Sequence, residues 1–184
     1  MVIGITYYPR KEQTIFKSIA SLRETFDGRV IIYCDGFDID CGEETIVKEN
    51  IGCFKHYARS LEHLVNQGSD EVLLMADDFI YKPNWIKTVY KKINRPKIGF
   101  CAIYTPYGLG KKQKWSRGSL GWREINGGFY SSWGGGYVMK TEVAKQLLQH
   151  PFFINHRDNY KENQQIDHCI PEVMYRLKLR QMGS

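Results

Sequence analysis

Residues 71–79 read Glu-Val-Leu-Leu-Met-Ala-Asp-Asp-Phe, an apolar run that ends in two adjacent carboxylates. A short apolar run that follows Gly68 and stops at two aspartates is typical of a buried β-strand. Carboxylate oxygens directly behind a rigid strand are the ligands that Mg²⁺ and Mn²⁺ prefer. The alternative is a solvated turn in which Asp77 and Asp78 cap the helix that begins near Trp85. The stretch therefore predicts a strand that leads into either a metal site or a helix cap.

Strands and helices alternate on both sides of this stretch. The apolar runs that predict strands are 2–7, 30–34, 71–76, 98–104 and 136–139. Apolar residues at helical spacing predict helices within 12–26, 58–65, 85–93 and 143–148. They also predict a helix within 166–177, where Pro171 either breaks the helix into two pieces or lies in a first turn. We expect 38–53 to be a loop with a short element and Phe152–Asn155 to be an edge strand. This order predicts an α/β fold, a single Rossmann-like domain with a mostly parallel central sheet and helices on both faces.

Polar residues end three of the predicted strands. Thr6-Tyr7-Tyr8 follows the first strand, Asp35 the second and Asp77-Asp78 the third. Ligands of such sheets bind at the carboxyl ends of the strands. We therefore expect these residues to converge on one edge and to form a binding site there.

Charge and composition narrow the class of partner. Lys plus Arg number 26 against 20 Asp plus Glu, and the net charge of +6 favours anionic partners such as nucleotide phosphates or nucleic acid. The five cysteines show no CxxC spacing, which argues against a zinc knuckle or a disulfide framework and suits a reducing compartment. No apolar run approaches the about 20 residues of a membrane span. We expect a cytoplasmic protein, of a cell or of an infected host cell.

Residues 106–136 differ from the rest of the chain. They hold 9 of the 17 glycines, together with three tryptophans and a cluster of lysines and arginines between 111 and 123. Such a long segment predicts a functional surface loop. Basic residues interleaved with tryptophans also occur in proteins that bind single strands or flipped bases. We favour a lid that gains phosphate contacts when it closes.

Three segments together resemble the GT-A-fold glycosyltransferases. These segments are 4–10 (Gly-Ile-Thr-Tyr-Tyr-Pro-Arg), 56–61 (His-Tyr-Ala-Arg-Ser-Leu) continuing to Asp78, and 134–139 (Gly-Gly-Gly-Tyr-Val-Met). They look like the first strand with its nucleotide-binding turn, the region of the metal motif, and the acceptor-side strand. The resemblance spans about residues 2–175. It implies a nucleotide-sugar-binding half at 1–104 and an acceptor-side half at 105–182.

The resemblance also implies roles for single residues. Asp78 would ligate Mn²⁺ or Mg²⁺, and Asp77 would contact the nucleotide or a metal-bound water. The donor would be a nucleoside diphosphate sugar, with a UDP-sugar expected. The residues expected to contact its nucleotide are Thr6, Tyr7, Arg10, Asp35 and Arg59. Ala76 departs from the family, because an acidic residue is usual at that position.

The last third of the chain supplies candidates for the chemistry. Inverting transfer to a hydroxyl needs a general base, for which we predict Asp167 first and Glu162 next, after weighing Asp158 as well; a helix cap is the alternative role for Asp167. Similar enzymes often use a carboxyl-terminal histidine on the metal, which makes His168 or His156 a candidate third ligand or, alternatively, a structural histidine. Trp133 with Gly134 and Gly135 would form an acceptor platform or, alternatively, a core tryptophan before a turn.

Several functions compete at this stage. A nucleotidyltransferase would carry a glycine-rich loop after the first strand, and residues 6–12 contain no glycine. A catalytically degenerate nucleotide-sugar-binding module remains an alternative because of Ala76. For a transferase, the hydroxyl acceptor could be a hydroxymethylated base in DNA, which the charge favours, or a glycan or protein. The sequence leaves the oligomeric state open.

Overall fold

A computed structural model describes residues 1–9, 13–81, 83–102, 123–125, 136–159 and 166–183. Its strands are β1 (Val2–Tyr7), β2 (Val30–Asp35), β3 (Glu44–Lys48), β4 (Glu71–Ala76), β5 (Ile98–Ala102), β6 (Arg123–Ile125), β7 (Gly136–Lys140) and β8 (Arg180–Gly183). Its helices are α1 (Ile15–Arg23), α2 (Cys53–Leu64), α3 (Trp85–Ile93), α5 (Thr141–Gln149), α6 (Pro151–Asp158) and α7 (Ile166–Arg176). These strands form one sheet in the order β3-β2-β1-β4-β7-β5-β8-β6.

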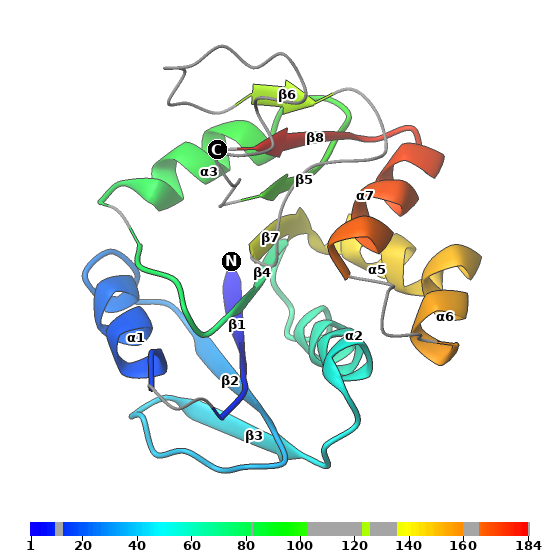
Figure 1. The fold of residues 1–184 in the computed structure, drawn as a ribbon. Coiled ribbons are helices and arrows are strands. Elements are labelled where there is room, and N and C mark those ends of the chain that lie inside the picture. Colours follow the sequence, from blue (N-terminus) through cyan, green and yellow to red (C-terminus); the bar gives the residue numbers. More distant parts are fainter. Residues whose placement is uncertain (10–12, 82, 103–122, 126–135, 160–165, 184) are drawn as a thin grey trace, which may run out of the picture.

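The sheet lies between two layers of helices (Figure 1). Helices α1 and α3 cover one face, and α2, α5, α6 and α7 cover the other. Strands β1 to β4 are mutually parallel, whereas β7 runs antiparallel between β4 and β5. The predicted α/β class, with a mostly parallel sheet and helices on both faces, is confirmed.

Alternation along β1 places its side chains in two separate cores. Ile3, Ile5 and Tyr7 pack on the α1 side, while Val2 belongs to the core on the α2 side. Gly4 also faces the α2 side, where a Cβ atom would lie 2.8 Å from Cε2 of Tyr33. Gly4 therefore makes room for the Tyr33 ring beneath α2.

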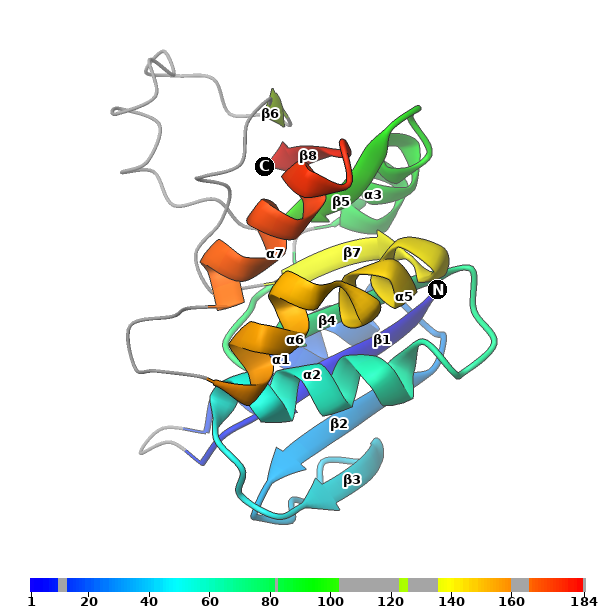
Figure 2. The same ribbon diagram turned by 90° about the vertical axis from the view of Figure 1, so that its right-hand side faces the viewer.

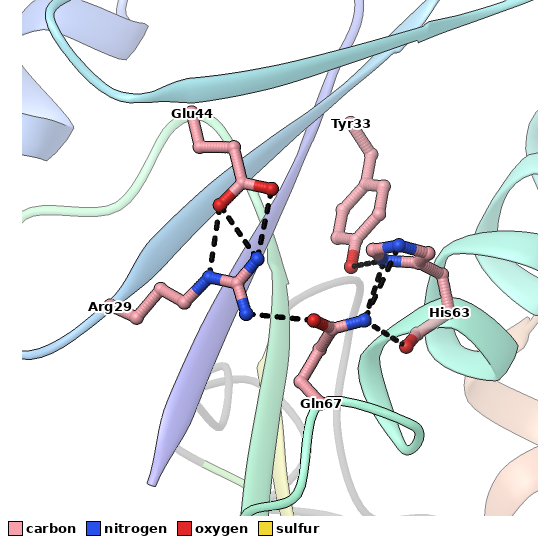
Figure 3. Close-up of polar contacts among 5 residues, drawn as sticks. All are labelled: Arg29, Tyr33, Glu44, His63 and Gln67. Atoms are coloured by element: carbon pink, nitrogen blue, oxygen red, sulfur yellow. Dashed lines mark hydrogen bonds and ion pairs between the residues drawn. The ribbon is translucent and has the colours of Figure 1, made fainter.

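A chain of polar contacts ties the carboxyl end of α2 to the sheet (Figure 3). The Arg29 guanidinium donates to both Glu44 oxygens at 2.9 and 3.0 Å and to Oε1 of Gln67 at 2.7 Å. Gln67 Nε2 donates to the His63 carbonyl oxygen at 2.9 Å, and the Tyr33 hydroxyl lies 2.9 Å from Nδ1 of His63. Strands β2 and β3 are thereby linked to the last turn of α2.

Two expectations about elements are wrong, and two strands were not expected. Phe152–Asn155 is not an edge strand but part of α6, because Pro151 opens the helix and Nδ1 of His150 accepts from the Phe152 amide at 3.1 Å. Helix α7 continues through Pro171 without a break. Strand β6 lies within the segment 106–136 that was predicted to be a surface loop. Strand β8 was not expected, because Arg180–Gly183 shows no apolar alternation.

Candidate functional site

The carboxyl ends of β1, β2 and β4 lie level at one edge of the sheet. Tyr7 pairs with Cys34 on one side of β1, and Thr6 pairs with Ala76 on the other. The residues that follow these pairs, among them Asp35 and Asp77, therefore meet at this edge. In Figure 2 the ends of β1 and β2, the start of α2 and the start of α7 all point to the same side of the molecule. The convergence expected from the sequence is thus present.

The two adjacent aspartates have different environments. Asp77 is 1% exposed, whereas Asp78 is exposed to solvent in the same turn. Burial raises the pKa of the Tyr7 phenol, and the negative charge of Asp77 raises it further. The N-cap of α3 is Asn84, so the helix-cap alternative for the two aspartates is wrong. One carboxylate thus faces solvent, while the other lies within the protein.

The segment after the aspartates is anchored to α1 and to the residues that follow that helix. The Tyr81 amide donates to the Ser21 hydroxyl at 3.1 Å, and the Trp85 indole donates to the Thr25 hydroxyl at 2.9 Å. The Tyr81 hydroxyl donates to the sulfur of Met75, and the Tyr81 and Trp85 rings pack with centroids 4.9 Å apart. These contacts fix where the chain leaves the Asp77-Asp78 turn.

The predicted nucleotide contacts of β1 are largely buried. The Thr6 hydroxyl donates to the Met75 carbonyl oxygen at 3.0 Å and is thus used within the sheet. Thr6 and Tyr7 are each 5% exposed, and Tyr7 packs into the core beside α1. These two residues lie in the interior beneath this edge of the sheet. Their contact with the base and ribose stays a prediction. Arg10 lies outside the described residues.

Asp35 ends β2 as a nearly buried carboxylate, 4% exposed. Its Oδ1 accepts from the Ile51 amide at 3.3 Å and lies 3.7 Å from Nδ1 of His56. Gly36 turns the chain away with φ +85°, a conformation that favours glycine. The site position predicted for Asp35 agrees with this geometry, and its ligand stays a prediction. Sequence reasoning gave His56 no role, because a single histidine in an amphipathic helix carries no distinctive spacing.

The remaining predicted residues are placed as follows. Arg59 lies on the exposed face of α2, and Asp167 and the exposed His168 lie in the first turn of α7. His156 bonds through Nδ1 to the Phe152 carbonyl oxygen at 3.0 Å within α6, which is the structural alternative. Glu162, Trp133, Gly134 and Gly135 lie outside the described residues. Strand β7 begins at Gly136, opposite Met75, so the chain enters β7 at the edge where the aspartates lie.

Asp158 can be set apart from the other candidate bases. The Arg157 side chain donates to its two oxygens at 2.7 and 3.0 Å. This hydrogen bonding lowers the Asp158 pKa below its usual value. A carboxylate with a lowered pKa is a weaker proton acceptor, which argues against Asp158 as the base.

The described residues suit a metal ion that takes only some of its ligands from the protein. Within the described ranges, no group of three or more His, Cys, Asp or Glu side chains is arranged to hold an ion. His168 is thus not gathered with the two aspartates into such a group. Mg²⁺ and its relatives are commonly bound through one or two carboxylates, with phosphate and water oxygens completing the shell. The exposed Asp78 carboxylate suits that mode of binding.

Comparisons with known proteins place the fold. No protein-family model matches the chain, and no curated protein matches it in sequence. A nucleotide-diphospho-sugar transferase structure from Desulfovibrio desulfuricans G20 superposes with a TM-score of 0.59 at 10% identity, covering 100% of this chain and 78% of that one. The mannosyltransferase PcManGT from Pyrobaculum calidifontis, in complex with GDP-Man and Mn²⁺, superposes with a TM-score of 0.61 at 10% identity. That match covers 98% of this chain and 53% of the mannosyltransferase.

The helices that the structure describes include none with the length and apolar character needed to cross a membrane. The sheet order, the two helical layers and the superpositions agree with one another. The chain has a GT-A-like glycosyltransferase fold.

Proposed function

We propose that this chain is a metal-dependent glycosyltransferase that moves a sugar from a nucleoside diphosphate sugar to a hydroxyl acceptor. The observation that carries the proposal is the meeting of Asp35, Asp77 and Asp78 at the carboxyl ends of β2 and β4, the two strands that flank β1. This is the edge at which α/β sheets bind their ligands. The GDP-Man and Mn²⁺ bound by the similar mannosyltransferase support the same class of ligand here.

Each carboxylate has a distinct task in this proposal. Asp78 is the exposed oxygen donor for Mn²⁺ or Mg²⁺, which when bound would neutralise charge on the leaving diphosphate. The proposed contact of Asp77 with the nucleotide or a metal-bound water requires this 1% exposed carboxylate to become accessible when the donor binds. Asp35 accepts a hydrogen bond from the base or ribose. Thr6, Tyr7 and Arg10 would line the base and ribose, and Arg59 would lie near the nucleotide.

The acceptor hydroxyl loses its proton to Asp167 in an inverting reaction. Asp167 is the second residue of α7, and the start of α7 points to the same side as the strand ends (Figure 2). Replacing Asp167 with Asn should lower kcat by about 100-fold or more while nucleotide affinity is unchanged. An equal loss of nucleotide affinity would instead assign Asp167 to the donor site.

The donor site is tested by thermal unfolding with UDP, GDP and CDP, each with and without Mn²⁺. A ligand that binds the native state at 100 times its Kd stabilises it by about 2.7 kcal/mol. We expect one nucleotide, UDP first and GDP second, to raise the melting temperature in a metal-dependent way. Asp78→Ala should abolish the shift.

Asp70→Ala is the matched control, because Asp70 is an exposed aspartate immediately before β4, at its opposite end. Asp70→Ala should keep the full nucleotide-dependent rise in melting temperature. If no nucleotide stabilises the protein with any metal, the donor site is refuted. A shift without any sugar transfer or hydrolysis would instead favour a nucleotide-sugar-binding module that has lost turnover.

For the acceptor we propose a hydroxymethylated base in DNA, on the support of the net charge of +6. Binding of DNA through phosphates releases counterions, so its affinity should fall steeply as salt rises. Transfer to hydroxymethylated DNA, measured against unmodified DNA and against glycan and protein acceptors, tests the proposal. Salt-independent transfer to a glycan or protein would overturn it.

A further inference from the structure

A buried histidine lies directly behind Asp35. His56 is 1% exposed, in the first turn of α2, and its Nδ1 lies 3.7 Å from Oδ1 of Asp35. On the other side of the ring, Nε2 lies 3.0 Å from the Tyr33 carbonyl oxygen. Asp35 and Tyr33 both belong to β2, so this imidazole spans two points of a single strand.

These contacts fix which nitrogen carries the proton. A carbonyl oxygen only accepts, so Nε2 of His56 must be the protonated nitrogen that donates to Tyr33. In the neutral ring, Nδ1 then presents a lone pair to the Asp35 carboxylate. A separation of 3.7 Å is too long for a hydrogen bond, as expected for two facing acceptors. A second proton on Nδ1 would turn this contact into an ion pair.

The surroundings of His56 leave Asp35 as its charged partner. The Tyr8 ring at the end of β1 packs edge-on against the imidazole, with centroids 5.4 Å apart. The Tyr8 hydroxyl donates to the carbonyl oxygen of Cys53, one turn earlier on α2. Of the described charges, Asp35 is the one that acts on His56; on the neighbouring helix α6, Arg157 and Asp158 pair with each other.

Burial lowers the His56 pKa below its usual value, and the bond to Tyr33 and the charge of Asp35 only partly offset that effect. His56 is therefore neutral at pH 7. Both contacts of Asp35 within the described part of the chain end on Oδ1. Its Oδ2 is the oxygen left to accept from a ligand.

We propose that His56 is a positioning residue for Asp35: the neutral ring leaves the carboxylate to the bound nucleoside, and the protonated ring draws it toward α2. This inference rests on the proposed function, because it takes Asp35 to hold the base or ribose of the donor. Ligand and proton compete for one carboxylate, so each weakens the binding of the other. Nucleoside affinity is accordingly highest when His56 is neutral.

This competition determines how the nucleoside affinity changes with pH. Affinity is constant above the His56 pKa and falls as pH drops below it, by at most about tenfold per pH unit for one proton. Since that pKa lies below 6.5, the loss belongs to the acidic side of neutrality. Between pH 7.5 and pH 5.5 we therefore expect nucleoside affinity to fall, by no more than about tenfold.

The experiment measures the Kd of uridine and of guanosine by NMR from pH 5 to pH 8. Neither nucleoside has a phosphate or needs a metal, and neither titrates in this range. The imidazole nitrogen signals of His56 are followed in the same samples. His56→Gln keeps an amide donor for the Tyr33 carbonyl but cannot titrate. His63→Gln, in the last turn of α2, is the matched control.

The inference predicts that nucleoside affinity falls between pH 7.5 and pH 5.5 in the unmodified protein and in His63→Gln. In His56→Gln the affinity should stay within about twofold over the same pH range. Nucleoside addition should also lower the His56 pKa seen in the imidazole signals. Binding with the same pH dependence in His56→Gln, or an imidazole pKa that ligand does not move, would overturn the inference and leave the donor site standing. Absence of nucleoside binding at every pH would overturn both.

Discussion

The missing side chain at Gly4 determines how closely α2 can approach the sheet. A Cβ atom there would lie 2.8 Å from the Tyr33 ring, 2.9 Å from Leu74 and 3.2 Å from Leu64. All three neighbours belong to the core beneath α2, and each is at most 2% exposed. Close packing of this kind leaves little freedom for one side chain to move without shifting the others.

Gly4→Ala should therefore destabilise the protein, although alanine is usually the safer residue in a strand. Overpacking of a dense core typically costs about 1–3 kcal/mol. Urea unfolding should show a lower midpoint with an unchanged slope. A variant as stable as the parent would mean that Tyr33 and Leu74 can both move aside.

At the scale of elements, the connection from β4 to α3 holds the candidate site in place. The connection begins with the Asp77-Asp78 turn and is attached to Ser21 through the Tyr81 amide. Strand β4 itself is buried on both faces. The turn is therefore held at its start by the sheet and at its end by α1.

Ser21→Ala should loosen the end of this turn. The substitution leaves the partly buried Tyr81 amide without its acceptor, at a cost of about 1–3 kcal/mol. Because the Asp77-Asp78 turn depends on that anchor, metal-dependent nucleotide affinity should fall as well, by about threefold to tenfold, a change of about 1 kcal/mol. Calorimetric titration with UDP or GDP and Mn²⁺ measures the change.

Ser69→Ala is the control for this prediction, because the Ser69 hydroxyl bonds to the Glu71 carbonyl oxygen at the opposite end of β4. It should alter stability without altering nucleotide affinity. Equal losses of affinity in both variants would show that stability, not the anchor, governs binding.

Elements with a strong apolar pattern were predictable, and elements set by tertiary contacts were not. The bounds of β4 and α3 match the apolar runs 71–76 and 85–93. Strand β3 lies at the sheet edge with Glu44 and Lys48 exposed, and its short Thr-Ile-Val centre stands within the mostly polar segment 38–53, which reads as a loop. In α6, the local cap by His150 overrides the strand preference of Phe152 and its neighbours.

The same distinction holds for the candidate site. Strands that alternate with helices predict a parallel sheet whose carboxyl ends share one edge, so the meeting of Asp35, Asp77 and Asp78 could be predicted. The burial of Asp77 and the pairing of Asp35 with His56 could not, because they depend on how a helix packs over the strand ends.

For the molecule as a whole, the sheet is completed by the last strand of the described chain. Strand β8 pairs parallel with β5 and antiparallel with β6. Leu179, just before β8, packs against the core on the α2 side and lies close to Gly99. The far half of the sheet thus depends on residues distant in sequence from its other strands.

Deleting residues 179–184 should lower the melting temperature by about 6–12 °C, which corresponds to about 3 kcal/mol for a domain of this size. Circular dichroism during heating measures the change. Nucleotide binding by the folded fraction should persist, because β1, β2 and β4 lie on the other side of β7. An unchanged melting temperature would show that β8 contributes little to the sheet.

Tyr33 has a consequence for the rotation of α2 about its own axis. Its carbonyl oxygen holds His56 and its hydroxyl holds His63, seven residues apart on one face of the helix. Inserting one residue between the two histidines would turn one of them by about 100° relative to the other, so Tyr33 could no longer hold both. A single residue of β2 thus sets the helical phase of α2, and length changes in this helix should be tolerated only before His56 or after His63.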